Sequence, residues 1–329
     1  MSDAQLIDSF DRHIRYLRMS VTDRCNLRCT YCMAEDMTFL PKSQVLSLEE
    51  MALVGKAFVD LGVEKIRLTG GEPLVRKGIV SLAEKLSSLD GLRELVMTSN
   101  GVLLDQHANQ LVQAGISRIN ISIDSLQPAR FKELTRFGKL DDVLRGINVA
   151  KTAGFKKIKL NAVILKGVND DEVIDLSRYA VDNGLDISFI EEMPLGEIDS
   201  HQRAETGITS ADIKNLIATE FSIQNTDFND STGGPSRYVQ IANSDTKVGF
   251  ISPMSDNFCG SCNRVRVTVE GQLLLCLGNE HSLDLRSILR ERPGDLKKEI
   301  VQSMQRKPER HYFDPNDITI LRHMSATGG

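Results

Sequence analysis

Three cysteines within eight residues constrain this chain more than any other feature. The stretch is Cys25-Asn26-Leu27-Arg28-Cys29-Thr30-Tyr31-Cys32, so the thiols are spaced four and then three residues apart. Thiolates are soft ligands that favour zinc or iron–sulfur centres over magnesium or calcium. A closed zinc site needs four ligands, and the nearest histidine, His13, has no ligand spacing to this stretch. A cubane iron–sulfur cluster normally takes four cysteines, so three would leave one iron open to a ligand from outside the protein.

The remaining cysteines form a second triplet. The six cysteines therefore divide into Cys25, Cys29 and Cys32, and Cys259, Cys262 and Cys276. The N-terminal stretch MSDAQLIDSFDR is acidic and lacks the apolar core of a secretory signal, and no run approaches the roughly 18 apolar residues of a membrane helix. We therefore expect a cytoplasmic protein with reduced thiols and two metal centres. A partial zinc knuckle or a set of buried thiols is the alternative for the first triplet.

The net charge and the length of the chain exclude some classes of protein and favour others. The formal net charge of −5 argues against a general nucleic-acid or membrane surface. An anionic substrate must then be held by a local cluster of basic residues. The length of 329 residues, 41% of them hydrophobic, indicates about two domains or one large α/β unit with a sizeable core.

Strand and helix patterns alternate through the first 195 residues. Residues 13–20 alternate polar and apolar side chains and predict a strand, which the cysteine stretch follows directly. Further strands are expected at 64–69, 92–98, 117–123, 156–163 and 186–191, and helices at about 48–61, 75–89, 104–114, 128–151 with a break near 138, and 170–183. Ser47 and Glu50 match a capping box at the start of the first helix.

Six strands are too few to close an eight-stranded barrel. The sequence thus predicts an α/β fold with a partial, open (β/α)₆ barrel of TIM type. In such folds the reactive groups lie at the C-terminal ends of the strands, where the cysteine stretch is expected.

The alternation ends near residue 195, so we expect one domain over 1–195 and a second over 196–329. Residues 196–207 and 225–236 are rich in Gly, Asp, Asn, Ser and Thr and predict linkers around a helix near 210–221. A C-terminal α+β unit should follow, with strands near 237–242, 246–251, 264–269 and 272–276. Glu270-Gly271 predicts a two-residue hairpin turn, and this hairpin carries Cys276.

Two sets of residues at strand ends are candidates for binding. In Thr69-Gly70-Gly71-Glu72-Pro73 the glycines let the backbone approach a ligand closely, and the Glu72 carboxylate can meet a cation; a turn that merely needs glycine is the alternative. Asn120 and Ser122 end the fourth predicted strand, and Met193 follows the sixth. Hydrogen-bonded strand-end residues and a core methionine are the alternatives for these three.

No glycine-rich phosphate loop of the Walker A type precedes either Gly-Lys pair in the chain. Arg264 and Arg266 lie two apart on a predicted strand and project from one face, directly after Cys262. Guanidinium groups bind polyphosphate through paired hydrogen bonds, so these two arginines are candidates for binding it. The alternative is that they lie on a solvated face of the sheet. Four further residues fall at or near strand ends and matter as a converging set: Lys65, Arg67, Thr98 and Lys159.

The motifs together resemble a known family over nearly the whole chain. The first cysteine triplet, with Tyr31 before its third member, and the Gly-Gly-Glu-Pro turn resemble the radical S-adenosylmethionine (SAM) signature. More specific are Cys259-Gly-Ser-Cys262-Asn-Arg264-Val-Arg266 with Cys276, the leading Leu17-Arg18-Met19-Ser20-Val21-Thr22-Asp23-Arg24, and the terminal Gly328-Gly329. With these the chain is similar to the radical SAM GTP 3′,8-cyclase family of molybdenum cofactor biosynthesis (the MoaA family). Ala34 stands where relatives often have proline.

The resemblance implies a radical SAM fold with two [4Fe-4S] clusters, one on each cysteine triplet. It implies that SAM bound to the first cluster yields a 5′-deoxyadenosyl radical, which abstracts hydrogen from C3′ of GTP, and that the ribose radical attacks C8 of guanine. The second cluster would hold the guanine base. The product would be (8S)-3′,8-cyclo-7,8-dihydroguanosine 5′-triphosphate.

The resemblance also implies residue roles and partners. SAM would be bound by Tyr31, Gly70, Gly71, Glu72, Ser122 and Met193. GTP would be bound by Arg18, Lys65, Arg67, Thr98, Lys159, Arg264 and Arg266. The catalytic set would be Arg264, Arg266, Gly328 and Gly329, with the C-terminal tail reaching the substrate chamber.

The implied partners are a reducing electron donor of flavodoxin or ferredoxin type and a downstream cyclic pyranopterin monophosphate synthase. The chain could assemble as a homodimer. We expect it to bind neither nucleic acid nor a membrane. Two alternatives stay open: a radical SAM enzyme that modifies a peptide or protein and carries an auxiliary cluster, and a zinc-stabilised scaffold or nucleic-acid adaptor.

Overall fold

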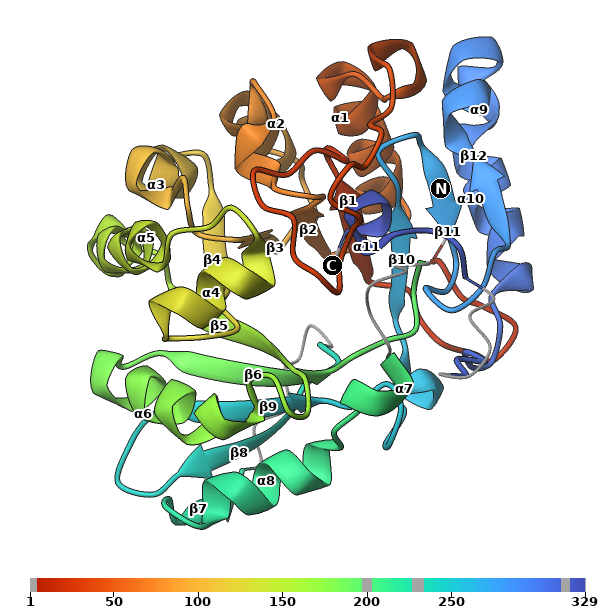
Figure 1. The fold of residues 1–329 in the computed structure, drawn as a ribbon. Coiled ribbons are helices and arrows are strands. Elements are labelled where there is room, and N and C mark those ends of the chain that lie inside the picture. The colour runs from red at the N-terminus through yellow and green to blue at the C-terminus, as the bar shows by residue number, and fades with distance from the viewer. Residues whose placement is uncertain (1–4, 197–202, 227–233, 315–319, 329) are drawn as a thin grey trace.

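The computed structural model describes residues 5–196, 203–226, 234–314 and 320–328. One sheet of twelve strands runs through this part of the chain in the order β12-β11-β10-β1-β2-β3-β4-β5-β6-β9-β8-β7. The sheet is curved, and its helices form an arc around the outside (Figure 1).

The six strands expected from the sequence pair in parallel in chain order. They are β1 (Tyr16–Ser20), β2 (Lys65–Thr69), β3 (Glu94–Ser99), β4 (Ile116–Ser122), β5 (Lys157–Ile164) and β6 (Asp186–Glu191). The connecting helices are α1 (Leu48–Asp60), α2 (Ile79–Ser87), α3 (Leu104–Gln113), α4 (Pro128–Thr135), α5 (Leu140–Ala153) and α6 (Val173–Asn183). The predicted break near residue 138 separates α4 from α5, and the capping box of Ser47 and Glu50 is present.

The C-terminal part of the chain extends the same sheet at both ends. Strand β10 (Arg264–Val267) lies parallel to β1, and β9 (Lys247–Ile251) lies parallel to β6. Beyond them β11 (Gln272–Leu274), β12 (Ser282–Asp284), β8 (Arg237–Ile241) and β7 (Ile223–Asn225) pair in antiparallel fashion. Since β12 and β7 end the strand order, the sheet is open, as predicted. The domain boundary at residue 195 stays a prediction.

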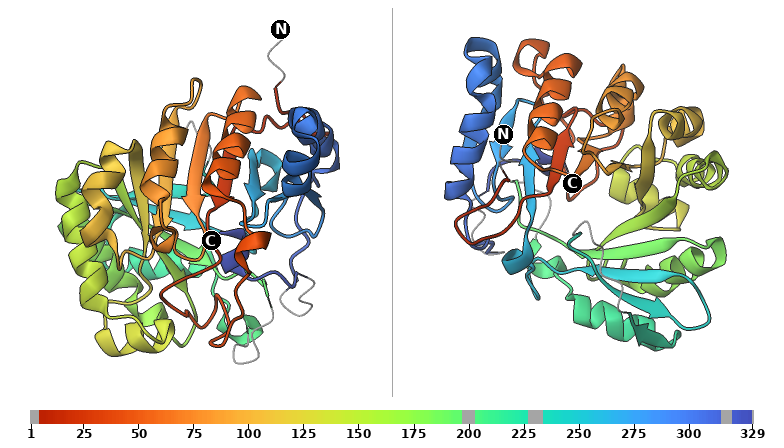
Figure 2. Two further views of the ribbon diagram at one scale, coloured as in Figure 1. Left: turned by 90° about the horizontal axis from the view of Figure 1, so that it is seen from above. Right: turned by 180° about the vertical axis from the view of Figure 1, so that it is seen from behind.

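Five further helices are described in the C-terminal half of the chain. They are α7 (Arg203–Thr206), α8 (Ser210–Ala218), α9 (Leu285–Glu291), α10 (Leu296–Ser303) and α11 (Met324–Thr327), of which the sequence predicted α8. Helices α9 and α10 pack against α1, and the view from behind shows them side by side (Figure 2). Helix α11 lies against β1, so the end of the chain sits inside the arc (Figure 1).

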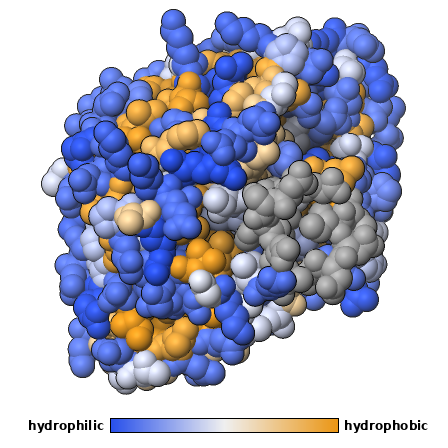
Figure 3. All heavy atoms as spheres, viewed as in Figure 1, coloured by the Kyte–Doolittle hydropathy of each residue, from blue (hydrophilic) through white to orange (hydrophobic). Residues whose placement is uncertain are grey.

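The hydrophobic core fills the space between the sheet and the helices. Phe58 of α1, Ile66 of β2 and Leu82 of α2 belong to it and are fully buried. Outside, the face in Figure 3 is largely hydrophilic, with apolar residues in separate patches. In the part of the chain that the structure describes, no helix is both long and apolar enough to span a membrane.

The hairpin between β10 and β11 differs from the prediction. Its turn covers Thr268–Gly271, where the Gly271 N–H donates to the Thr268 carbonyl at 2.9 Å, and the Thr268 N–H donates to the Gln272 carbonyl at 2.9 Å. Gly271 has φ +87°. The prediction of a two-residue turn was therefore wrong: three residues form the loop, and the last takes the left-handed conformation that suits glycine.

The two glycines after β2 pack directly against the start of the cysteine stretch. A Cβ on Gly71 would lie 2.4 Å from the Arg24 carbonyl oxygen. The Gly71 N–H donates to the Thr22 carbonyl at 2.8 Å, and the Glu72 N–H donates to the Arg24 carbonyl at 2.8 Å. Because Cys25 follows Arg24, this turn positions the first cysteine.

We predict that Gly71→Ala displaces the cysteine stretch. The added methyl group would meet backbone, which cannot move aside cheaply, and overpacking of this kind costs about 1–3 kcal/mol. Iron bound per chain after anaerobic reconstitution should fall. The matched control is Gly294→Ala, because a Cβ there would meet nothing within 4 Å. Equal iron content in the two variants would show that this contact does not position Cys25.

Candidate active site

Two cavities meet inside the curved sheet. The first, which we call the first chamber, is bordered by Cys25, Cys29 and Cys32 and by residues after the strand ends, and encloses about 1110 Å³ including its open part. The second chamber is bordered by Cys259, Cys262 and Cys276 and by the interior of the sheet, and encloses about 1210 Å³ on the same measure. Asn161, Ile190 and Met193 border both chambers, which are therefore neighbours.

Local hydrogen bonds shape the loop that carries the first triplet. The N–H groups of Cys32 and Met33 both donate to the Cys29 carbonyl, at 3.0 and 3.2 Å, and so fold the loop into a turn. The Tyr31 hydroxyl donates to an Asp124 carboxylate oxygen at 2.7 Å, while the other oxygen accepts the Val163 N–H at 2.8 Å. Tyr31 is thereby held at the chamber wall beside β4 and β5.

The first triplet fits an iron–sulfur cluster. Burial raises the pKa of Cys25 to about 11, and burial together with the neighbouring Cys32 raises the pKa of Cys29 well above its usual value. Three thiolates can gather here when a cation offsets their charge, which a cluster does. The Leu27 N–H and the Asn100 side-chain amide already donate to the Cys25 sulfur, at 3.3 and 3.7 Å.

Five of the six residues predicted to bind SAM border the first chamber: Tyr31, Gly70, Gly71, Ser122 and Met193. Glu72 is fully buried and is not among the chamber residues. Its carboxylate accepts hydrogen bonds from the Leu74 N–H, the Ser99 hydroxyl and the Asn100 N–H, and burial raises its pKa to about 7. Ser99 and Asn100 border the chamber, so Glu72 holds two residues of the chamber wall in place through its hydrogen bonds. Its contact with SAM stays a prediction.

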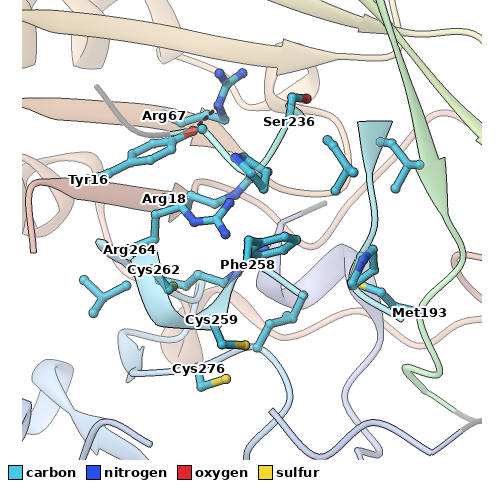
Figure 4. Close-up of a pocket in the computed structure, with 18 of the residues that line it drawn as sticks. Tyr16, Arg18, Arg67, Met193, Ser236, Phe258, Cys259, Cys262, Arg264 and Cys276 are labelled. Atoms are coloured by element: carbon cyan, nitrogen blue, oxygen red, sulfur yellow. Dashed lines mark hydrogen bonds between the residues drawn. The ribbon is translucent and has the colours of Figure 1, made fainter. Parts of the chain in front are cut away.

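The second chamber gathers the predicted basic residues. Six of the seven residues predicted to bind GTP border it: Arg18, Lys65, Arg67, Lys159, Arg264 and Arg266. Lys65 and Arg67 lie two apart on β2, and Arg264 and Arg266 lie two apart on β10, so each pair projects from one face of the sheet. The strand register sets Arg18 between Arg67 on β2 and Arg266 on β10. In Figure 4, Arg264 lies beside Cys262 of the second triplet, and Arg18 lies next to Arg264.

Thr98 borders the first chamber instead, and its hydroxyl accepts a hydrogen bond from Arg67 at 3.0 Å. Thr98 thus links the wall of one chamber to a basic residue of the other.

The second chamber carries an excess of positive charge. Its described lining includes seven Lys or Arg side chains, Arg118 being the seventh, and no Asp or Glu. Lys65 and Arg118 share one carboxylate outside the lining, Glu94, at 2.9 and 3.1 Å. Burial and the charges of Arg18 and Arg264 lower the pKa of Arg266 well below its usual value. An anionic ligand would relieve this crowding of buried charge.

The second triplet also fits an iron–sulfur cluster. Its members border one chamber, and the Cys262 N–H donates to the Cys259 carbonyl at 3.0 Å. Burial alone would raise the pKa of Cys262, but the charges of Arg264 and Lys307 lower it to about 7. Among the described residues no set of three His, Cys, Asp or Glu side chains forms a site for a single metal ion. The thiols of each triplet border one chamber, where a cluster with one iron per thiolate could be held.

Sequence reasoning missed several residues of the second chamber. Tyr16 precedes Arg18 by two positions and Arg118 precedes Asn120 by two, so strand alternation could have revealed both. Tyr238, whose hydroxyl accepts a hydrogen bond from Lys159 at 3.2 Å, and Phe258, whose ring lies 4.8 Å from the Arg264 guanidinium, gave no local signal.

The end of the C-terminal tail is packed rather than frayed, since Ser325, Thr327 and Gly328 are buried. Arg266 donates hydrogen bonds to the carbonyls of Thr327 and Gly328. A Cβ on Gly328 would lie 2.1 Å from the Thr69 side chain, and its φ is +75°, so the position requires glycine. Met324 borders the first chamber. Gly329 lies outside the described residues.

Tyr16 is a buried tyrosine among cations. Its hydroxyl accepts a hydrogen bond from the Arg67 Nε at 2.5 Å, and Figure 4 shows the two side chains together. Burial alone would raise the pKa of Tyr16, but the surrounding positive charges, that of Arg67 foremost, lower it to about 7.

We predict that one tyrosine titrates near pH 7 and that Tyr16→Phe removes this titration, as followed by NMR of isotope-labelled tyrosine rings. Between about pH 7 and the unfolded value near 10, the unfolded chain binds one more proton, so ionised Tyr16 makes folding more favourable as pH rises. Tyr312→Phe is the control, since Tyr312 is 66% exposed. If the titration persists in Tyr16→Phe, it belongs to another residue than Tyr16.

Two protein-family models match the chain. The model of the Radical SAM superfamily matches residues 19–180, and the model described as Molybdenum Cofactor Synthesis C matches residues 185–313. A protein named GTP 3′,8-cyclase from Pseudomonas entomophila (strain L48) is 57% identical over 329 residues, covering 98% of each chain. One of the same name from Saccharophagus degradans is 55% identical over 333 residues, covering 100% of each.

Solved structures share the fold at low identity. The crystal structure of Streptococcus suis SuiB aligns with a TM-score of 0.62 at 15% identity, covering 89% of this chain and 68% of that one. The structure of SuiB bound to S-adenosylmethionine aligns with a TM-score of 0.59 at 18% identity, covering 89% and 69%. These likenesses support the fold, while the relatives of high identity bear on the family.

Proposed function

We propose that this chain cyclises GTP to (8S)-3′,8-cyclo-7,8-dihydroguanosine 5′-triphosphate, the first step of molybdenum cofactor biosynthesis. The reason is that the chain belongs to the GTP 3′,8-cyclase family of radical SAM enzymes. The observation that carries the assignment is the second chamber, where the described lining has seven cationic side chains and no carboxylate beside a cysteine triplet. A triphosphate supplies the negative charge that this lining lacks. The same lining favours a nucleotide over a peptide substrate.

Each cysteine triplet would hold one [4Fe-4S] cluster, and SAM would bind in the first chamber against Tyr31, Gly70, Gly71, Ser122 and Met193. When bound, the first cluster and SAM supply an organic radical that can take a hydrogen atom from a sugar carbon. The chain's own task is to bring the substrate sugar to the boundary between the chambers and to keep water out. Met193, Ile190 and Asn161 form that boundary.

The basic residues would fix the orientation of GTP. Arg18, Arg264 and Arg266 would hold the triphosphate, while Lys65, Arg67 and Lys159 line the same chamber along β2 and β5. Several contacts from rigid strands restrict the substrate to one pose, and such positioning can lower a barrier by several kcal/mol. Arg266 would connect this site to the tail, because it also binds the Gly328 carbonyl.

We further propose the cellular setting. The chemistry needs a one-electron reductant, so we propose a donor of flavodoxin or ferredoxin type, and a cyclic pyranopterin monophosphate synthase as the enzyme that takes the product. Six cysteines without a disulfide fit a cytoplasmic location. A homodimer is the assembly to test by light scattering.

The central test is anaerobic incubation of the purified protein with SAM, a reductant and GTP, followed by mass analysis of the products. We expect the cyclised nucleotide, of unchanged mass and altered chromatographic mobility, together with 5′-deoxyadenosine. Cys25→Ala should abolish both products, whereas Cys259→Ala should retain some 5′-deoxyadenosine. If Cys25→Ala still cleaves SAM, the two triplets have been assigned to the wrong roles.

We predict that Arg264→Ala or Arg18→Ala weakens GTP binding by roughly 10- to 150-fold, since charge-assisted hydrogen bonds contribute about 1.5–3 kcal/mol each. Calorimetry with GTP and with guanosine separates phosphate contacts from the rest, because guanosine has no phosphate to lose. Arg93→Ala is the matched control, as Arg93 lies outside both chambers with its side chain 72% exposed. Equal losses for GTP and guanosine would contradict a phosphate role.

We predict that removing Gly328-Gly329 stops cyclisation while iron content and uncoupled SAM cleavage stay near normal. Without the tail, Arg266 loses its carbonyl partner at Gly328 and is free to turn from the substrate. Leu321→Ala is the control on the same segment, since Leu321 is 62% exposed. If the truncated protein cyclises GTP at the full-length rate, the last two residues have no role in the reaction.

A further inference from the structure

A buried lysine lies against the second cysteine triplet. Lys307 follows the short 3₁₀ turn Met304–Arg306 and is 3% exposed. Its ammonium donates to the Cys262 sulfur at 3.8 Å, to the Arg264 carbonyl at 3.1 Å and to the Leu275 carbonyl at 2.6 Å. The three protons of the ammonium thus all have acceptors, and one acceptor is a cysteine of the triplet.

These acceptors come from both arms of the triplet. Arg264 lies two residues after Cys262, and Leu275 directly precedes Cys276. Lys307 therefore connects the loop of Cys259 and Cys262 to the end of β11.

The charge of Lys307 requires a counterpart. A buried ammonium is unfavourable unless an anion or several strong acceptors compensate it. Two of its acceptors are neutral carbonyls, and no Asp or Glu is among the described residues that line the adjoining chamber. The charge of Lys307 favours the thiolate forms of Cys262 and Cys276, and its ammonium contacts the Cys262 sulfur directly.

Arg12, a second buried cation near the same loop, has different partners from Lys307. Arg12 donates to the carbonyls of Cys259, Pro308 and Glu309 at 2.7–2.8 Å and is paired with the Asp8 carboxylate at 2.6 Å. Its charge is neutralised locally, and its bonds go to backbone oxygens rather than to sulfur. Arg12 holds the loop in place, whereas Lys307 directs its charge at a cysteine.

We propose that Lys307 is a positioning residue that acts on the C-terminal iron–sulfur cluster as its charge partner, donating an N–H···S bond to the Cys262 ligand and raising the reduction potential of that cluster. Hydrogen bonds to ligand sulfurs and a nearby positive charge stabilise the reduced, more negative cluster. The inference rests on the part of the proposed function that places a cluster on Cys259, Cys262 and Cys276, and not on GTP cyclisation.

The test is a redox titration of the full-length protein, reconstituted with both clusters and followed by electron paramagnetic resonance (EPR). SAM is added so that the signal of the first cluster can be told apart. In Lys307→Met we expect a lower midpoint potential for the second cluster, an unchanged first cluster, and a smaller loss in Lys307→Arg. Lys298→Met on the exposed face of α10 is the matched control and should titrate like the wild type. An unchanged potential in Lys307→Met at full iron content would overturn the proposal.

A second measurement begins with the wild-type protein. In wild-type protein grown with nitrogen-15 lysine, pulsed EPR of the reduced second cluster should detect coupling to a lysine nitrogen, and Lys307→Arg should remove it. Absence of the coupling in the wild type would overturn the proposal even if Lys307→Met fails to fold. A wild-type protein that holds about four irons rather than about eight would instead contradict the proposed second cluster.

Discussion

Buried positive charge inside the curved sheet is the constraint on which the rest of the structure depends. Closed barrels of this type fill their interior with branched apolar side chains. Here the inner positions of β1, β2, β5 and β10 carry basic residues such as Arg18, Arg67 and Arg266. Such an interior cannot close into a dry core, because these charges need anions or acceptors. The sheet is open, and the cavity inside it is the substrate chamber we propose.

The same charges explain why distant segments converge on the chamber. The Gly328 carbonyl, at the end of the chain, accepts from Arg266, and the Tyr16 hydroxyl, at its beginning, accepts from Arg67. Lys307 turns toward a cysteine sulfur and two carbonyls. Each contact supplies electron-rich oxygen or sulfur to a buried cation. The protein therefore surrounds its excess positive charge with carbonyl, phenol and thiol groups and leaves the remaining compensation to ligands.

The placement of β10 joins the two cysteine triplets into one site. Strand β10 follows Cys262 directly and pairs in parallel with β1, whose end leads into the first triplet. Arg264 and Arg266 consequently lie beside Tyr16 and Arg18. The C-terminal segment thus forms a wall of the sheet's interior, and the two chambers share Asn161, Ile190 and Met193.

The sequence by itself determined the features that depend on neighbouring residues. Cysteine spacing identified both triplets, period-two alternation put Arg264 and Arg266 on one face, and the alternating strands and helices predicted the open barrel. Tertiary structure decided what depends on long-range pairing: β10 beside β1, the burial of Gly328, the position of Tyr238 and Phe258 at the second chamber, and the contact of Lys307 with Cys262. Local periodicity fixes the face on which a side chain projects, but which segments meet depends on the packing of the whole chain.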